Sequence, residues 1–410
     1  MRNVLRPLVM MLAVLLFLAA CGAESSETDA DTAENETAVT NNQPTGESEI
    51  ESLKVEVVGS YADIVYANYV DAYDTAVILQ TALQEFVASP SDATHQAAKE
   101  AWLAAREPYG QTEVYRFYGG PIDDENGPEG LINAWPLDES YVDYVEGAPE
   151  AGIINNQADY PAIDADLLES LNEAGAEENI STGYHAIEFL LWGQDMNADG
   201  SGDRSYTDYT EALNADRRGQ YLLTAADLLV GHLADLVTAW EPNAADNYRA
   251  AFLAQPADDA IQKMLTGMGV LSKSELAGER IFVAYDNQDQ EDEHSCFSDN
   301  THRDIINNAQ GIVNVYTGSY TRVDGTTVSG ASLADLVAAL DTAVAADMDA
   351  LVETALASTQ SIYVPFDQAI VLAEHRPTVL ESVNALQDQG DKVAEVASLL
   401  GLAINTDLPE

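Results

Sequence analysis

Long stretches of this sequence place apolar side chains at alternating steps of four and three residues, which gathers them on one face of a helix. The first stretch predicts a helix over residues 55–87, with a buried seam of Val65, Tyr69, Ala72, Ala76, Leu79, Leu83 and Phe86. Ser89-Pro90-Ser91 interrupts it, and Ser91 or Asp92 is placed to cap a second helix that runs to about residue 118. Repeated seams of this kind are typical of helical bundles.

The same spacing continues through the rest of the chain. It predicts further helices over residues 207–241, 257–285 and 302–317, and two or three more after the turn Asp324-Gly325. Residues 119–163 are instead rich in loop-forming residues, and so long a connection in a bundle usually covers a site. We therefore predict an all-α fold of two helical-bundle domains, each like a four-helix bundle, with a cleft between them.

The predicted domain limits are 1–20 for a signal peptide, 21–53 for an acidic disordered tether, 54–241 for the first bundle and 242–410 for the second. A weak internal echo accompanies the two bundles. Thr112-Glu113, a polar loop and His185 in the first are matched by Ser274-Glu275, a polar loop and His294 in the second. The echo fits a duplication in which each bundle gives one acidic helix and one histidine stretch to a shared cleft.

The N-terminus has the features of an export signal. Arg2 and Arg6 precede an apolar run, Leu8–Leu18, that is too short for a comfortable membrane span. It ends in Leu18-Ala19-Ala20-Cys21, which resembles the lipobox of bacterial lipoproteins and makes Cys21 the predicted lipidation site. The acidic, apolar-poor stretch that follows cannot bury enough surface to fold. We expect an exported lipoprotein, held at the outer membrane by its lipid alone if the source is Gram-negative.

The overall charge limits the possible partners. The chain has 70 acidic and 17 basic residues, a formal net charge of −53 at pH 7. Nucleic acids and anionic membrane surfaces are therefore excluded as partners. Because the acidic residues are spread along the whole chain, a solvated surface adapted to a saline habitat is the plainest explanation. Cys296 is the only cysteine besides Cys21, so no disulfide framework is expected, and we expect Cys296 to be buried and inert.

The segment Gly183–Asp195 is the centre of the functional prediction. It reads as a short helix, capped by Ser181 and Thr182, on which His185 and Glu188 lie three residues apart and share a face. An imidazole and a carboxylate so placed are either two metal ligands or a hydrogen-bonded pair with a purely structural role. The zinc-peptidase motif H-E-x-x-H is absent, and H-x-x-E-H fails because Phe189 stands where its second histidine belongs.

Two other polar stretches are candidates for the walls of a cleft. The second helix carries Arg106, Glu113 and Arg116 among several aromatic residues, and the seven-residue spacing of Arg106 and Glu113 places them on one face, as an internal ion pair or as a binding wall. Residues 289–304 bring together histidines and carboxylates that suit iron, zinc or copper. Glu113, His294, Asp299 and His302 are therefore further candidate ligands. The alternative for the last stretch is that Thr301 only caps the helix that follows.

An acidic loop directly follows the central helix. Its oxygen-bearing side chains are spaced as in the first half of an EF-hand calcium loop, at Asp195, Asn197, Asp199 and Asp203, with Gly200 at the sixth position. The twelfth position, normally glutamate, is Tyr206. The loop is either a calcium site or an acidic turn stabilised by its own side chains.

The sequence resembles the imelysin family, the group that contains the iron-regulated protein A type. The resemblance rests on Gly183-x-His185-x-x-Glu188, the family's G-x-H-x-x-E motif, which continues through Phe189 to Gly193. Supporting matches are the stretches 106–117 and 294–302. The resemblance implies two helical bundles with these motifs near their interface, in a periplasmic or surface lipoprotein linked to iron uptake and its partner proteins. Some members of the family are described as peptidases.

Three functions follow from these residues. The first is binding of a metal ion, with iron favoured and zinc or copper as alternatives. The second is a metallopeptidase in which Glu188 is the catalytic residue, although a zinc hydrolase needs three protein ligands, an open position and a general base. The third is a metal-independent binder of a peptide or polysaccharide. A small ligand would contact Arg106, Glu113 and Arg116 in any of these.

Overall fold

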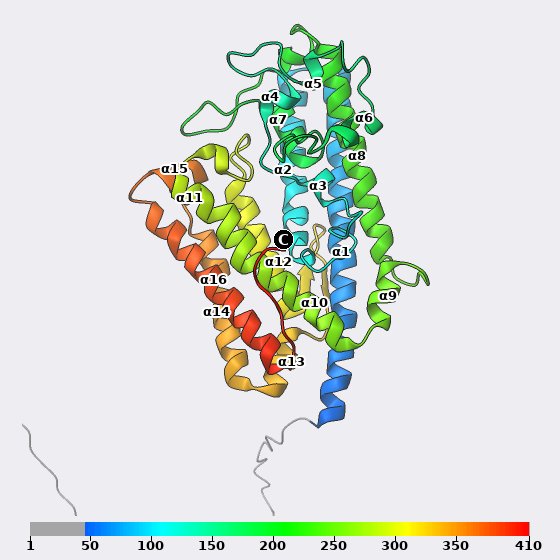
Figure 1. Cartoon of the computed structure of the whole chain (residues 1–410), viewed down its shortest axis with the longest axis vertical. Helices are drawn as coiled ribbons and strands as arrows, with labels where there is room; N and C mark the ends of the chain where they lie inside the picture. Colours follow the sequence, from blue (N-terminus) through cyan, green and yellow to red (C-terminus); the bar gives the residue numbers. More distant parts are fainter. Residues whose placement is uncertain (1–45, 410) are drawn as a thin grey trace, which may run out of the picture. The chain divides into compact units, whose positions relative to one another are not determined.

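The structure, a computed structural model, describes residues 46–409. The predicted signal peptide, Cys21 and the tether as far as residue 45 lie outside the described residues. The all-α prediction is confirmed, since the described chain is built of helices apart from one small hairpin (Figure 1). Pro44–Glu410 clusters as one compact unit with a continuous apolar core. The domain limit between residues 241 and 242 stays a prediction.

Three long helices form the first part of the unit. They are α1 (Glu47–Ala88), α2 (Asp92–Gly110) and α8 (Ala215–Trp240), and α1 packs along both of the others (Figure 1). The short helix α7 (Gly183–Trp192) packs against α2 and α8, and all ten of its residues are buried. By length and composition α8 could cross a membrane, but Leu229, Leu233 and Leu236 lie in the apolar core, as expected for an internal helix.

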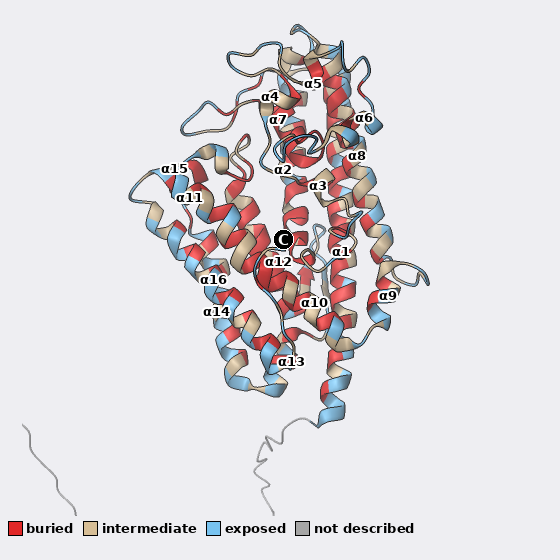
Figure 2. Ribbon diagram, in the orientation of Figure 1, coloured by how far each residue is buried: buried red, intermediate tan, exposed pale blue. Residues whose placement is uncertain are grey.

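The second part begins with one long helical run. It consists of α10 (Ala257–Val270), the π-helical segment η3 (Leu271–Phe282) and α11 (Val283–Asn287). Around it lie α12 (Thr301–Thr317), α13 (Leu333–Leu340), α14 (Thr342–Gln360), α15 (Phe366–Val371) and α16 (Arg376–Leu399). Helix α12 also packs on α2 and on the following turn η1 (Gln111–Tyr115), which joins the two parts. Figure 2 shows that the facing sides of these helices are buried.

Short elements fill the connections. They are α3 (Glu129–Ile132), α4 (Glu139–Val142), α5 (Gly152–Asn155), α6 (Ala165–Leu171), η2 (Tyr206–Tyr209), α9 (Tyr248–Ala254) and η4 (Gln290–Asp292). The turn predicted at Asp324-Gly325 joins the strands β1 (Ser319–Thr321) and β2 (Thr327–Ser329), which the sequence did not reveal. The hairpin is fixed to α1 because the Tyr320 hydroxyl donates to the buried Asp71 carboxylate at 2.9 Å.

Helix α1 begins at Glu47, earlier than predicted, so residues 47–53 of the predicted tether are helical. The Glu49 carboxylate accepts the Gly46 N–H at 3.2 Å, and acidic residues in a first helical turn are favourable beside the positive end of the helix dipole. Ile50 and Lys54 are also buried. These contacts outweigh the polar composition of the segment.

Helix α2 ends at Gly110 rather than near 118, and the chain continues as the turn η1. Side chains from two neighbouring helices bind the carbonyls at this end. Asn68 donates to the Pro108 carbonyl and Asn308 to the Gly110 carbonyl, both at 2.9 Å. Carbonyls at a helix end need such partners, so tertiary contacts stabilise a stop that the local sequence does not encode.

The predicted Ser91 cap of α2 is confirmed, since its hydroxyl oxygen accepts the Thr94 N–H at 3.3 Å, whereas the side chains of Ser181, Thr182 and Thr301 do not cap their helices. Thr182 occupies the N-cap position of α7 without a capping hydrogen bond, because its hydroxyl donates to Asn172, while Ser181 donates to the Leu168 carbonyl. Thr301 lies inside α12 after the N-cap residue Asn300, and its hydroxyl oxygen accepts the Ser295 N–H at 3.1 Å. The hydroxyl groups of Ser181, Thr182 and Thr301 therefore bind neighbouring segments and do not cap their own helices.

Candidate functional site

Two buried histidine–carboxylate pairs meet between α7 and the loop before α12. His185 Nδ1 lies 2.9 Å from Glu188 Oε2, and His294 Nδ1 lies 2.8 Å from Asp304 Oδ2. The two imidazole rings contact each other edge to face, with centroids 4.7 Å apart. Residues more than one hundred positions apart in the chain therefore form one centre.

Local backbone geometry fixes the first pair. Gly183 begins α7 with φ +78°, a conformation that favours glycine, and a Cβ there would lie 2.4 Å from the Ile132 carbonyl oxygen. The helix can therefore approach α3 this closely only with glycine at its first position. His185 and Glu188 follow Gly183 by two and five residues, and they project from the same face of the helix.

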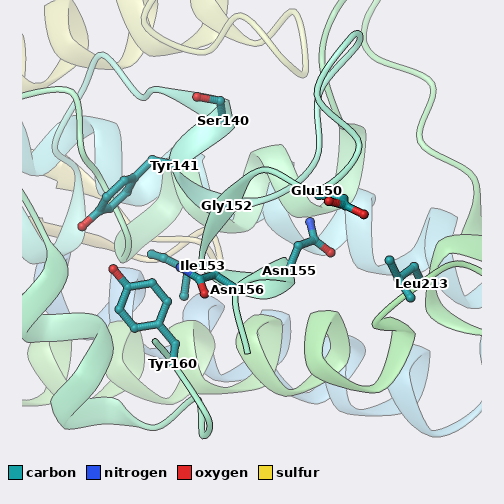
Figure 3. Close-up of a pocket in the computed structure, with 9 residues that line it drawn as sticks. All are labelled: Ser140, Tyr141, Glu150, Gly152, Ile153, Asn155, Asn156, Tyr160 and Leu213. Carbon is teal, nitrogen blue, oxygen red and sulfur yellow. The ribbon is translucent and has the colours of Figure 1, made fainter. Parts of the chain in front are cut away.

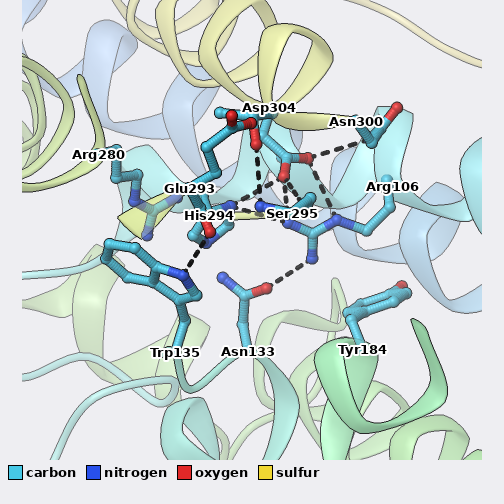
Figure 4. Close-up of polar contacts among 12 residues, drawn as sticks. Arg106, Asn133, Trp135, Tyr184, Arg280, Glu293, His294, Ser295, Asn300 and Asp304 are labelled. Atoms are coloured by element: carbon cyan, nitrogen blue, oxygen red, sulfur yellow. Dashed lines mark hydrogen bonds and ion pairs between the residues drawn. The ribbon is translucent and has the colours of Figure 1, made fainter. Parts of the chain in front are cut away.

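Asp304 organises the second pair, as Figure 4 shows. Its carboxylate pairs with the Arg106 guanidinium at 3.1 Å and accepts the Ser295 hydroxyl at 2.5 Å as well as the His294 contact. Arg106 in turn donates to the Asn133 side-chain oxygen at 2.5 Å. The predicted ion pair between Arg106 and Glu113 is not formed, because α12 supplies a closer carboxylate.

The two carboxyl groups differ in their ionisation. The Arg106 guanidinium holds the pKa of Asp304 well below its usual range against the opposing effect of burial. Burial raises the pKa of Glu188 to about 8, although the Ser298 N–H and hydroxyl both bind its other oxygen, at 3.0 and 2.6 Å. Burial lowers the pKa of both His185 and His294 to about 3. Both imidazoles are therefore neutral at neutral pH.

The outer nitrogens of the two rings are unused. Nε2 of His185 and Nε2 of His294 are buried and have no hydrogen-bond partner among the described residues. The ionised Asp304 accepts a hydrogen bond from the Nδ1–H group of His294, which leaves the lone pair of this neutral ring on Nε2. His185 adopts the same tautomer when Glu188 is ionised. Buried polar atoms in native proteins nearly always have partners, so these two adjacent nitrogens are the candidate ligand atoms of the site.

Glu113 belongs to a separate ionic network beside the histidines. Its carboxylate binds Arg280 at 2.6 Å and Arg116 at 2.7 Å, and Glu275 binds Arg280 at 2.8 Å. Arg280, Arg116 and hydrogen bonding hold the pKa of Glu113 well below its usual range. Glu113 and Glu275 are the two acidic residues of the internal echo, and His185 and His294 are its two histidines. In the structure the two histidines contact each other, and the two glutamates bind the same arginine, Arg280.

The π-helical segment explains why Arg280 was not predicted. Glu275 and Arg280 are five residues apart, which corresponds to one turn of a π-helix but to different faces of an α-helix. In η3 the Arg280 Nε donates to Glu275 at 2.9 Å, and the same guanidinium reaches Glu113 from the other part of the unit. If residues 257–285 formed one α-helix, as predicted, Glu275 and Arg280 would lie on different faces of it.

A solvent-accessible pocket of about 340 Å³ opens onto the site. His294, Asn133 and Trp135 line it together with Arg116 and Arg280. The Trp135 ring contacts His294 at 5.5 Å between centroids, and its N–H donates to the Glu293 carbonyl at 2.7 Å (Figure 4). The second histidine is therefore accessible from outside although almost none of its surface is exposed.

The imelysin family model matches residues 65–393, which is most of the chain. The chain belongs to the imelysin family. It is 28% identical to the "Iron-regulated protein A" of Synechococcus elongatus over 82% of this chain and 83% of that protein.

Two solved structures share the imelysin fold with this chain. One is described as an iron-regulated protein A precursor from Parabacteroides distasonis, with 20% identity, a TM-score of 0.68, and coverage of 88% of this chain and 97% of that one. The other is an imelysin-like protein from Psychrobacter arcticum 273-4, with 16% identity, a TM-score of 0.61, and coverage of 87% and 98%. At these identities the likeness shows the fold alone.

The remaining candidate ligands of this imelysin chain are His302 and Asp299. His302 Nδ1 contacts the Asp299 carbonyl at 3.1 Å, so His302 is turned to its own loop. Burial raises the pKa of Asp299 to about 7, and the nearby carboxyl groups of Asp367, Asp195 and Glu188 add to this effect. Within residues 46–409, no three His, Cys, Asp or Glu side chains converge as a ready-made metal site. His185 and His294 are in contact and remain the candidate donors within this part of the chain.

The acidic loop after α7 is folded around its own groups. Asp195 accepts the Asn197 N–H at 2.9 Å, and the Asn197 amide donates to the Ser201 carbonyl at 2.7 Å. These contacts correspond to the acidic-turn alternative, while Asp199 and Asp203 remain calcium candidates from spacing only. Burial raises the pKa of Asp195 to about 6.

Cys296 is partly rather than fully buried, and it is a free thiol. Burial raises its pKa well above the usual value, an effect increased by Glu188, Glu291 and Glu293. The thiol is thus held in its unreactive protonated form, as the prediction of an inert cysteine requires.

The largest hollow described lies elsewhere, in the loop-rich region 138–160. It has a volume of about 560 Å³ and is lined by Tyr141, Tyr160, Asn155 and Asn156 among others (Figure 3). The amide of Asn155 already donates to Asp143, and the amide of Asn156 to Asp159. The side-chain amides of Asn155 and Asn156 are therefore occupied by the protein itself.

Proposed function

We propose that this imelysin-family chain is an exported lipoprotein that binds a metal ion, with iron favoured, through Nε2 of His185 and His294, and that it takes part in iron uptake. The proposal rests on one observation. Two neutral, buried imidazoles in contact each have Nδ1 bound to a carboxylate and Nε2 without a partner.

The arrangement has the form of a histidine–carboxylate metal centre. In such centres a carboxylate binds one ring nitrogen, orients the imidazole and makes the other nitrogen a stronger ligand. Asp304 is ionised and placed for this role, and Glu188 is placed for the same role once it has lost its proton. If the pairs were purely structural, the outer nitrogens would be expected to contact other polar groups. The two rings would also have no reason to lie in contact, with centroids 4.7 Å apart.

Binding fits the site better than peptide hydrolysis. A zinc peptidase needs three protein ligands and a free general base. Both oxygens of Glu188 are occupied, one by His185 and the other by Ser298. Glu113 is committed to two guanidinium groups. Two protein donors with the remaining coordination positions filled by solvent suit a metal that is held and then released.

The choice of iron and of location comes from other observations. Imidazole ligands accept iron, zinc and copper alike, so the iron preference follows the name of the Synechococcus relative. The lipobox-like sequence ending at Cys21 supports anchoring at the outer membrane by lipid alone. Delivery to iron-uptake partner proteins is part of the proposal.

Metal titration tests the proposal. The purified full-length protein is stripped with chelator and titrated with ferrous, ferric, zinc and copper ions, alongside a His185→Ala/His294→Ala double variant. A His232→Ala variant is the matched control, because this half-buried histidine on α8 does not line the pocket and pairs with Glu169 at 3.3 Å. We expect stoichiometric binding by the natural protein and the control, and a loss of at least about a hundredfold in affinity in the double variant.

Equal binding by all three proteins would show that the histidine pairs are structural. A peptide-cleavage assay on the metal-loaded protein and a Glu188→Gln variant then separates the two metal-dependent functions. Turnover that disappears in the variant would establish the metallopeptidase instead of the carrier.

A further inference from the structure

The pocket that leads to His294 has a strongly acidic entrance. Glu173 and Glu177, in the loop after α6, and Glu279, on η3, line it and are exposed to solvent. None of these three carboxylates forms an ion pair with a basic side chain among the described residues. We refer to Glu173, Glu177 and Glu279 as the entrance carboxylates.

The two cations of the pocket do not offset this charge. Arg116 binds Glu113, Glu129 and Glu275, at 2.7, 3.2 and 3.8 Å, and Arg280 binds Glu113 and Glu275. Two guanidinium groups thus face three carboxylates before the entrance carboxylates are counted. The lining as a whole therefore carries more carboxylates than guanidinium groups, and the unpaired carboxylates lie at the entrance.

His294 is the histidine that this pocket reaches. His294 lines the pocket, is 2% exposed and has no partner for its Nε2 atom. An acidic surface alone would only reflect the composition of the chain. Unpaired carboxylates at the entrance of a pocket that His294 lines, with its buried Nε2 lacking a partner among the described residues, are a second and independent indication of a cationic ligand.

We propose that the metal reaches the histidine pair through this pocket as a hydrated cation, drawn in by the entrance carboxylates, and not as an anionic chelate such as iron(III) citrate. This inference rests on the proposed metal binding and specifies the form in which the metal arrives. An anionic chelate would be repelled by the entrance carboxylates and would find both guanidinium groups already paired. A hydrated cation is attracted, and it keeps waters on the positions that two imidazoles leave open.

Electrostatic steering makes the proposal measurable as a rate. Clefts of one charge raise the association rate of an oppositely charged ligand by roughly 10- to 1,000-fold, and salt abolishes the effect. The probe is Co²⁺, and the signal is quenching of the tryptophan fluorescence, to which Trp135 contributes from its contact with His294. Stopped-flow traces of the full-length protein give association and dissociation rates separately.

The test compares two triple variants of equal charge. The entrance variant is Glu173→Gln/Glu177→Gln/Glu279→Gln, and the control is Glu211→Gln/Glu353→Gln/Glu381→Gln, which changes three exposed carboxylates that do not line this pocket. We expect the entrance variant to bind Co²⁺ about tenfold more slowly than the control at low ionic strength. The difference should disappear at 1 M salt, where the Debye length is about 3 Å, and the dissociation rates should match.

Equal association rates in the two variants would overturn the inference, as would binding of intact iron(III) citrate as fast as binding of the free ion. Both results leave metal binding itself standing. Failure of the natural protein to bind any cation, or normal binding by the His185→Ala/His294→Ala variant, would instead refute the proposed metal site. The two failures are therefore distinguishable.

Discussion

Asp304 and Glu188 are two buried carboxyl groups that each contact a histidine, but their pKa values are shifted in opposite directions. Each lies within 2.9 Å of an imidazole Nδ1, and the two imidazoles are in contact. Asp304 also pairs with Arg106, and its pKa lies well below the usual range. Glu188 has only Ser298 as a further partner, and burial raises its pKa to about 8.

The difference shows that burial alone does not decide the charge of a carboxyl group. Removing a carboxylate from water disfavours its ionised form, and in Asp304 the contact with Arg106, aided by hydrogen bonds, reverses that effect. The same contrast separates the two sides of the site. On one side Glu113 and Asp304 are neutralised by arginines, whereas on the other Glu188, Asp299 and Asp195 all have raised pKa values without an arginine contact.

The largest effect is expected from Asp304→Asn. This change leaves the Arg106 guanidinium, which is 1% exposed, without a counter-charge, and breaking a buried pair in this way costs about 3–5 kcal/mol. Urea unfolding followed by circular dichroism measures the loss. The control is Glu107→Gln, which breaks the half-exposed pair between Glu107 and Arg303 and should cost less than about 1 kcal/mol. Similar losses in both variants would mean that the buried pair is not a distinct environment.

A smaller effect with a distinctive pH dependence is expected from Glu188→Gln. Because the folded-state pKa of Glu188, about 8, lies above its ordinary value of 4.5, the folded protein holds a proton that the unfolded chain releases between these values. The contribution of Glu188 to stability is therefore fully present below about pH 4.5 and declines as the pH rises to 8. Glutamine does not titrate.

Urea unfolding at pH 4.5, 6 and 8 checks this prediction. The free energy of unfolding of the natural protein, minus that of the Glu188→Gln variant, should fall steadily across the series. A difference that stays constant, or that grows with pH, would show that Glu188 is ionised in the folded protein like Asp304.

The smallest perturbation uses Cys296 as a reporter of the side that lacks arginine. Burial and the nearby carboxylates raise its pKa, so little thiolate is present at pH 8. We expect iodoacetamide to modify Cys296 at least about tenfold more slowly in the folded protein than in urea, as followed by mass spectrometry of the peptide that contains it. A faster reaction in the folded state would mean that this side contains a compensating cation.

Several parts of the site could be predicted from residue spacing. His185 and Glu188 share a helical face in the sequence and in the structure, and His294, from the second polar stretch that we predicted, lies in contact with His185. Asp304, Arg280 and Ser298 were missed as members of the site. Asp304 lies two residues after His302 in a helix that the sequence did predict, but no local pattern identifies Arg106, 198 residues away, as its partner.

The sequence by itself determined the helical class, the positions of most long helices and the presence of a histidine–carboxylate motif, because each depends on interactions within one or two turns. The tertiary structure decided which charges are neutralised. Arg106 pairs with Asp304 instead of Glu113, and Arg280 reaches Glu113 from a π-helical segment. The pairing depends on which helices approach one another and on the cost of leaving any buried charge without a partner, and neither can be read from spacing along the chain.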